Sequence, residues 1–219
     1  MIRKISSTAA ALLLIASLCA WQQPNKRYEA TFLSLFDTVT TVVGYAPSRG
    51  DFTAQAQFIH DELEQYHRLY DIYHSYEGLS NLKTINDKAG REPVVVDHKI
   101  ISMLQMAKKL ALETDGRFHP VFGSVTSLWH DYREAGIDDP EQAALPPMPL
   151  LQQAALHTAL DRLVIDEAAS TVYLADPAMR LDVGAIAKGY AVEQVSRAAR
   201  ANGFSSGLIS VGGNVCAIG

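Results

Sequence analysis

The stretch that decides the fold of this chain runs Leu181-Asp182-Val183-Gly184-Ala185-Ile186-Ala187-Lys188-Gly189-Tyr190. An apolar run ending at Leu181 gives way to an acidic residue, a turn of small residues and then Lys188. From Ala187 to Ala201 the apolar residues recur with the period of a helix. A turn of small residues that opens a helix presents unpaired backbone N–H groups at the positive end of the helix dipole, so this segment suits the binding of an anion.

Two charged side chains of this stretch sharpen the interpretation. Lys188 places a cation in the first turn of the helix, where the dipole favours an acid, and this indicates that a phosphate binds there. Asp182 could accept a hydrogen bond from a sugar or a base, or approach a metal. The alternative is that Asp182 caps the helix and Lys188 is solvated. On spacing alone the two interpretations are equally open, because isolated Gly/Lys turns are weak signals.

Three further motifs occur in a fixed order along the chain. Phe36-Asp37-Thr38 lies near the start, Thr114 to Pro120 precedes an apolar segment, and Gly207 to Asn214 predicts a strand, a glycine turn and a second strand. Together with Asp182 to Tyr190, these motifs resemble the bacterial FAD:protein FMN transferases, the flavin transferases of the ApbE family. The resemblance runs from about Tyr28 to the last residue.

The resemblance implies an activity and its partners. The protein is expected to bind FAD and magnesium and to transfer the FMN moiety through its phosphate to a threonine of an acceptor protein, releasing AMP. The implied acceptor is a flavoprotein subunit of a membrane or extracytoplasmic electron-transport system. Such a transfer requires neutralisation of the pyrophosphate and in-line placement of the threonine oxygen. A non-catalytic, exported FAD-binding protein is the main alternative. A solute-binding lipoprotein is a third, which the Asp182–Tyr190 segment disfavours.

The matched motifs also assign candidate binding residues. The side chains and turns expected to contact FAD are those of Phe36, Tyr73, Tyr76, Arg117, Phe118, His119, Asp182, Lys188, Gly212, Gly213 and Asn214, and the backbone carbonyl of Ala185 is the expected metal ligand. No catalytic base is assigned.

Several of these residues have alternative roles. Tyr73 and Tyr76 belong to the segment from Asp71 to Leu82, which resembles a further family segment that lies against the cofactor. Their faces suit stacking on an isoalloxazine or adenine ring, and packing in the core is the alternative for either. Phe36 could equally be a core residue of a strand. His119 stands where the family more often has Asp or Asn; a neutral imidazole still donates or accepts, and His119 is the best candidate for a pH-sensitive group.

Composition sets limits on the class of protein. The chain has 219 residues, 48% of them hydrophobic, which is enough for one large core or two small ones. A net charge of -5 without a basic stripe excludes nucleic acid as an expected partner. The cysteines and histidines lack the spacing of a zinc site, so zinc is not expected.

The N-terminus predicts export. Residues 1–20 combine a basic start with the apolar run from Ala9 to Leu18, as in a signal peptide or a lipoprotein signal. Cys19 is a candidate for lipid modification, although Leu18 is bulkier than usual before such a site. An ordinary cleaved signal or an uncleaved anchor is the alternative. We therefore expect residues 21–27 to be a tether at the extracytoplasmic face of the cell membrane, to which the N-terminus attaches the protein.

Residues 28–219 are expected to form the flavin transferase domain, lacking its C-terminal part. Family members continue past the Gly-Gly-Asn turn with a His-containing segment and with positions that complete the metal site, so we expect this chain to be part of a longer protein. The expected fold is α/β in the mixed α+β sense. Mixed or antiparallel sheets with flanking helices would form a two-lobed unit, with the cofactor in a cleft between the lobes.

Hydrophobic patterns predict the individual elements. Tyr28 to Tyr45 predicts extended chain, with Phe36 and Asp37 inside a strand or at a bulge. Helices are expected over residues 51–70, 100–114, 151–159 and 187–201. Residues 162–166 and 171–174 predict a hairpin. Residues 130–150, charged and then rich in proline, predict a surface loop without chemistry.

Overall fold

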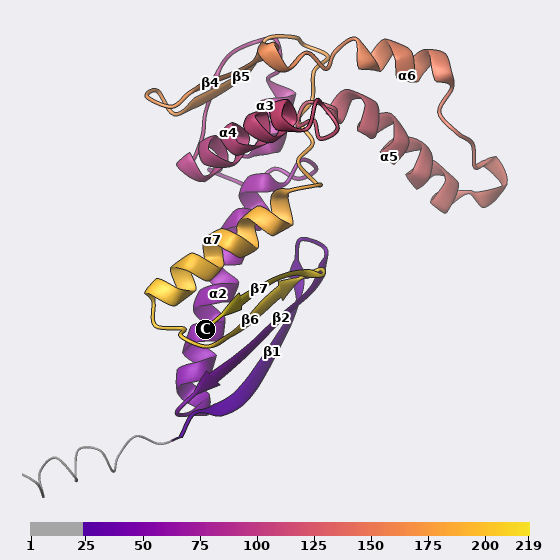
Figure 1. Cartoon of the computed structure of the whole chain (residues 1–219). Coiled ribbons are helices and arrows are strands. Elements are labelled where there is room, and N and C mark those ends of the chain that lie inside the picture. The colour runs from indigo at the N-terminus through magenta and orange to yellow at the C-terminus, as the bar shows by residue number, and fades with distance from the viewer. Residues whose placement is uncertain (1–23) are drawn as a thin grey trace, which may run out of the picture.

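The structure of this chain is a computed structural model that describes residues 24–219. The predicted signal segment and Cys19 lie outside the described residues. Within residues 24–219, none of the helices combines the length and the apolar character needed to span a bilayer. The described chain has two lobes joined by one long helix (Figure 1). It contains two antiparallel sheets with flanking helices, which confirms the predicted mixed α/β fold.

The first lobe is built on a four-stranded antiparallel sheet in the order β1-β2-β6-β7. Its strands are β1 (Lys26–Leu35), β2 (Thr38–Ala46), β6 (Gly207–Val211) and β7 (Asn214–Ile218). Along β2 the buried side alternates with the outer side, and Thr40 and Val42 point inward. β-Branched residues fit such a half-buried pleated surface, which is why this part of the chain is strand.

Phe36 and Asp37 form the two-residue turn between β1 and β2, rather than lying inside a strand or at a bulge. The register pairs Leu35 with Thr38, and Phe36 and Asp37 have φ angles of 53° and 52°. Left-handed backbone at both central positions is the geometry of a tight hairpin turn whose twist matches that of the strands. The prediction missed this turn because Phe36 is a bulky residue at a position usually taken by asparagine, aspartate or glycine, and Asp37 stands where glycine is usual.

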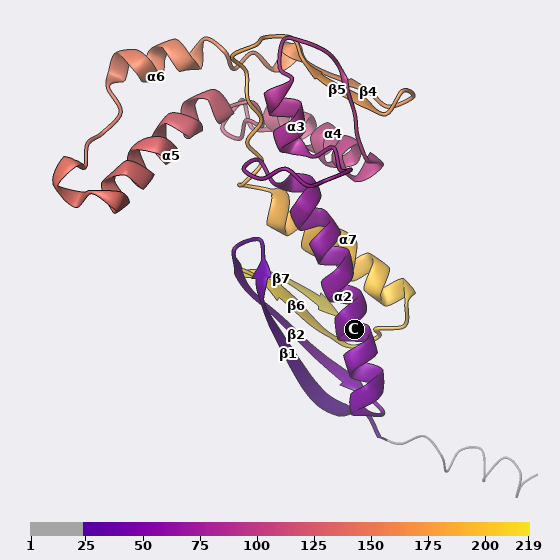
Figure 2. The same cartoon turned by 180° about the vertical axis from the view of Figure 1, so that it is seen from behind.

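Two helices cover one face of this sheet (Figure 2). They are α2 (Arg49–Tyr70) and α7 (Ala187–Ala201), which confirms the prediction for residues 187–201. α2 begins two residues earlier than predicted, because the side chain of Ser48 caps it by accepting from the Asp51 amide. Since α2 is 22 residues long, it extends beyond the sheet and into the second lobe.

The second lobe contains a three-stranded antiparallel sheet in the order β3-β5-β4. Its strands are β3 (Val94–Val95), β4 (Leu163–Asp166) and β5 (Thr171–Leu174), and the last two form the predicted hairpin. The helices α3 (Leu82–Asp87) and α4 (His98–Glu113) pack on it. Asp97 caps α4, so this helix starts two residues before the prediction.

An arm of two helices projects from the second lobe (Figures 1 and 2). It consists of α5 (Gly123–Asp138), the short turn η1 (Pro140–Gln142) and α6 (Met148–Ala155), and the turn η2 (Leu160–Arg162) returns to the sheet. The prediction of a loop over residues 130–150 was therefore wrong in its first half. Most of α5 is exposed, so the burial pattern that reveals a helix is weak there.

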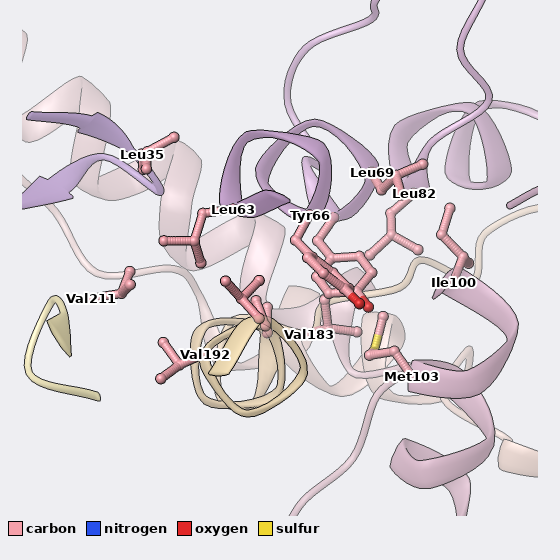
Figure 3. Close-up of a cluster of buried hydrophobic side chains, with 14 of the residues drawn as sticks. Leu35, Leu63, Tyr66, Leu69, Leu82, Ile100, Met103, Val183, Val192 and Val211 are labelled. Atoms are coloured by element: carbon pink, nitrogen blue, oxygen red, sulfur yellow. The ribbon is translucent and has the colours of Figure 1, made fainter. Parts of the chain in front are cut away.

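One hydrophobic core runs through both lobes along α2 (Figure 3). Leu63 of α2 and Val192 of α7 both belong to this cluster, and Ile100 and Met103 of α4 continue it into the second lobe. Val183 also belongs to this core and is 2% exposed. The segment that precedes α7 is thus held by packing at the junction between the lobes.

Candidate functional site

The segment before α7 is held in place by hydrogen bonds from distant parts of the chain. The buried side chain of Asn86 accepts from the Leu181 amide at 2.7 Å and donates to the Leu181 carbonyl at 3.1 Å. The amide of Asp182 donates to the carbonyl of Pro120 at 2.9 Å. Asp182 is therefore presented from a backbone that α3 and the loop before α5 both fix.

The carboxylate of Asp182 organises the turn that follows it. Its Oδ1 accepts from the Gly184 amide at 2.9 Å, and its Oδ2 accepts from the Thr126 hydroxyl of α5 at 2.6 Å. The N-cap of α7 is Ile186, so Asp182 is not the capping residue that the simplest interpretation required. The Ala187 amide at the start of α7 donates to the Val183 carbonyl at 2.8 Å. Ile186 makes no side-chain hydrogen bond to the first turn, so no side-chain cap satisfies the amides that follow.

Three cavities adjoin this turn, and Tyr73 and Asp182 line all three. The first, of about 610 Å³, lies along α5 and includes Trp129 and His130 in its wall. The second, of about 140 Å³, is lined by residues of the β1–β2 turn, of the end of α2 and of the start of α7, among them Phe36, His67 and Lys188. The third, of about 250 Å³, follows the 180–182 backbone. The three cavities therefore surround the same two side chains, Tyr73 and Asp182, and we refer to them together as the branched cleft.

Tyr73 is oriented by a turn that Asp71 organises. The Asp71 carboxylate accepts from the amides of Tyr73 and His74 and from the hydroxyl of Tyr76. Burial by itself would raise the pKa of Asp71, but these hydrogen bonds outweigh it and the pKa is lowered. The Tyr73 ring lies against His130 of α5, with the ring centroids 4.9 Å apart. Burial and the nearby Asp182 carboxylate raise the pKa of the Tyr73 hydroxyl.

Tyr76 lies on the other side of this turn. Its hydroxyl donates to Asp71 at 2.8 Å, and the Arg68 guanidinium lies over its ring, 4.7 Å from the centroid. Tyr76 lines none of the three cavities that Tyr73 borders. Of the two tyrosines proposed as stacking residues, the structure thus brings Tyr73 to the cleft and uses Tyr76 to brace the turn.

Arg117, Phe118 and His119 lie in the loop between α4 and α5, away from the walls of these three cavities. Burial lowers the pKa of His119, which favours the neutral imidazole. Its Nδ1 is buried and has no hydrogen-bond partner among the described residues. The next residue, Pro120, provides the carbonyl that accepts from the Asp182 amide, so this loop helps to hold Asp182 in place without lining the cavities.

Gly212, Gly213 and Asn214 form the hairpin between β6 and β7, beside the start of α7. The φ angles of the two glycines are 53° and 87°, and a side chain at Gly212 would collide with Thr38 of the neighbouring hairpin. A Cβ added at Gly189 would lie 3.3 Å from Oδ1 of Asn214, so the hairpin and the α7 N-terminus are in contact range. Gly213 faces open space, where a ligand can approach the backbone.

The cleft offers a ligand aromatic faces and charged groups of both signs. Lys188 shares its branch with the carboxylates of Asp37, Asp71 and Asp182. The cavity along α5, of about 610 Å³, has the volume of a small-molecule site. Residues 24–219 contain no cluster of three His, Cys, Asp or Glu side chains able to hold a metal. The exposed Ala185 backbone and the Asp182 carboxylate are oxygen donors that could hold a magnesium ion only if phosphates and water supplied its other ligands.

Comparison with known proteins identifies the family of this chain. The model of the ApbE family matches residues 36–219, which is most of the chain. This chain belongs to the ApbE family. Among its relatives, the FAD:protein FMN transferase of Treponema pallidum (strain Nichols) is 33% identical over 64% of this chain and 38% of its own length. That of Klebsiella pneumoniae (strain 342) is 31% identical over 69% of this chain and 48% of its own length.

Solved ApbE structures share the fold. The ApbE protein of Thermotoga maritima MSB8 superposes with a TM-score of 0.74 at 26% identity, over 89% of this chain and 59% of that one. The apo form of the flavinyl transferase ApbE of Pseudomonas stutzeri gives a TM-score of 0.73 at 22% identity, over 90% and 62%. This chain spans about half the length of the ApbE relatives that it matches.

Sequence reasoning missed the part of this cleft that α5 supplies. Thr126 holds Asp182, and Trp129, His130 and Tyr132 line the 610 Å³ cavity together with the 143–146 segment. The concentration of aromatic residues and a histidine between 129 and 132 was the available signal. It was overlooked because the surrounding charges and prolines favoured a loop.

Proposed function

We propose that this protein transfers the FMN moiety of FAD, through its phosphate, to a threonine of an acceptor flavoprotein, with release of AMP and with magnesium. The observation that carries the proposal is the branched cleft around Tyr73 and Asp182, with Lys188 in the wall of one branch. Membership of the ApbE family and the names of its relatives support the same activity.

Each group in the cleft has a role in this proposal. Lys188 and the uncapped first turn of α7 would neutralise the pyrophosphate, where charge must be balanced for a phosphoryl group to move. Tyr73 and Phe36 offer aromatic faces for a flavin or adenine ring. Asp182, fixed by Thr126 and the Gly184 amide, would orient the ligand.

Magnesium would supply charge neutralisation at the phosphates. In this chain, the Ala185 carbonyl and Asp182 are the proposed protein donors, and their small number implies that FAD and metal bind together. A lysine placed beside the same phosphates would complement the metal by stabilising the negative charge that develops on the AMP phosphate as it leaves.

The proposed setting is the extracytoplasmic face of the cell membrane. The basic and apolar pattern of residues 1–20 supports export, and Cys19 is the proposed lipid attachment point. An acceptor in a membrane or extracytoplasmic electron-transport system would then lie within reach of the cleft.

The test is flavin transfer to an acceptor domain that carries the target threonine. This chain, FAD, magnesium and the acceptor are incubated, and the acceptor is analysed by in-gel flavin fluorescence and mass spectrometry. We expect a threonine-linked FMN adduct that chelation of magnesium abolishes and that Lys188→Ala reduces at least tenfold. Lys109→Ala is the matched control, because Lys109 is exposed and paired with Glu113 on the outside of α4.

Two results would contradict this proposal in different ways. Saturable FAD binding without any adduct would favour the alternative, a non-catalytic FAD-binding protein. Equal transfer by the wild type and the Lys188→Ala variant would show that Lys188 at the start of α7 does not bind the phosphates.

A further inference from the structure

A histidine on α2 holds the turn that carries Phe36. The backbone amide of Phe36 donates to Nδ1 of His67 at 3.2 Å, across 31 residues of sequence. The two rings also meet edge to face, with centroids 5.5 Å apart and planes inclined by 73°. The turn is therefore attached to α2 by a hydrogen bond and an aromatic contact at the same position.

The turn needs such an attachment. Phe36 and Asp37 both have left-handed backbone, which is unusual for a bulky residue such as phenylalanine. The pairing of Leu35 with Thr38 closes the hairpin and leaves the Phe36 amide outside the ladder. His67 supplies the acceptor that the ladder does not, and so favours one orientation of the turn.

His67 and the turn also lie in the wall of the cleft. Phe36, Asp37 and His67 line the same branch as Asp182 and Lys188. α2 is a rigid element of 22 residues whose buried face belongs to the core of both lobes, so a side chain on it is a fixed reference point. A change in the turn would move the Phe36 ring relative to Lys188.

We propose that His67 is a positioning residue, which accepts the Phe36 amide hydrogen at Nδ1 and so sets the Phe36 ring for contact with FAD. The inference rests on the proposed function, because it takes FAD as the ligand of this cleft. The bond requires a lone pair on Nδ1, so the ring must carry its hydrogen on Nε2. An asparagine at position 67 can place its Oδ1 near the position of Nδ1, whereas leucine cannot accept a hydrogen bond.

The experiment compares His67→Leu with His67→Asn in two measurements. FAD affinity is measured by quenching of flavin fluorescence in the presence of magnesium, and exchange of the Phe36 amide hydrogen is followed by NMR. We expect His67→Leu to weaken FAD binding about 3- to 10-fold, the usual effect of one hydrogen bond, and to accelerate amide exchange. His67→Asn should stay within about twofold of the wild type in both measurements. His60→Leu is the control, because His60 is on the same helix but its ring lies tilted against Phe32 and not against Phe36.

The outcomes separate this inference from the proposed function. If the wild type binds FAD and His67→Leu binds it equally well with unchanged Phe36 exchange, the positioning role is overturned while the proposed function stands. Equal weakening by His67→Leu and His67→Asn would also overturn it, because the acceptor would then be irrelevant. No saturable FAD binding by the wild type would overturn the proposed function and this inference together.

Discussion

Asn86 is the residue on which the placement of Asp182 depends most directly. Its side chain forms two hydrogen bonds with the backbone of Leu181, at 2.7 and 3.1 Å, and Leu181 is 1% exposed. Asn86→Ala would leave a buried N–H and a buried carbonyl without partners, and each costs about 1–3 kcal/mol. Because water can enter part of the vacated space, we expect the variant to lose about 2–4 kcal/mol of the free energy of unfolding.

Urea unfolding followed by circular dichroism measures this loss as a lower midpoint with an unchanged slope. Asn202→Ala is the control, since Asn202 lies exposed at the end of α7, and its expected change is within about 0.5 kcal/mol. FAD affinity of Asn86→Ala should fall as well, even under conditions where the variant is fully folded. A loss below about 1 kcal/mol for Asn86→Ala would refute the reasoning, because the two bonds would then be replaceable by solvent.

Three further predictions concern stability. The hydrogen bond from His157 lowers the pKa of Asp176, so this carboxylate stabilises the fold fully above its unfolded pKa of about 3.9. That contribution is lost as the pH falls through the folded pKa. In Asp176→Asn, the free energy of unfolding should therefore fall less steeply with decreasing pH in the acid range. Gly123→Ala would bring a Cβ to 2.6 Å from the Arg180 carbonyl, and we expect thermal unfolding to show a loss of about 1–3 kcal/mol. Gly50→Ala lies in the first turn of α2, where the added Cβ would make only an ordinary contact with Oγ of Ser48 at 3.6 Å, and it should gain about 0.4–1 kcal/mol in the same measurement.

Each of these three predictions would be contradicted by a specific result. If the free energy of unfolding of Asp176→Asn fell with decreasing pH as steeply as that of the wild type, the carboxylate would be equally stabilised in the unfolded chain. If Gly123→Ala left the free energy of unfolding unchanged, α5 would be able to move away from the segment before Asp182 at little cost. A destabilised Gly50→Ala would contradict the helical, unstrained backbone of that position.

The sequence predicted elements where one local pattern dominates. The helix over Ala187–Ala201 has a strong apolar stripe, and the β6–β7 hairpin has two glycines with positive φ, so both could be located before the structure was known. The Phe36–Asp37 turn could not, because its left-handed backbone is imposed by the strands and by His67 rather than by residues that favour it. α5 was missed for a related reason: it is largely exposed and shows little hydrophobic alternation.

In the candidate site too, the sequence predicted individual residues but not the interactions that position them. Asp182, Tyr73, Lys188 and Phe36 were all named from the motifs, and the structure gathers them around one cleft. The interactions that hold them there connect segments far apart in sequence, such as Asn86 with Leu181, and no local pattern encodes such pairs. Thr126 belongs to this group too, since its hydroxyl matters only because α5 brings it to the Asp182 carboxylate.

The central claim is that the cleft around Tyr73 and Asp182 binds FAD. The most direct measurement is a titration of this chain with FAD and magnesium by isothermal calorimetry, repeated for Tyr73→Ala and for the control Tyr45→Ala on the outer face of β2. Loss of a ring stacked on the ligand should weaken binding by about 1 kcal/mol or more, a factor of at least 5, while Tyr45→Ala should bind like the wild type. Saturable binding of equal affinity in wild type and Tyr73→Ala, or no binding in either, would contradict the claim.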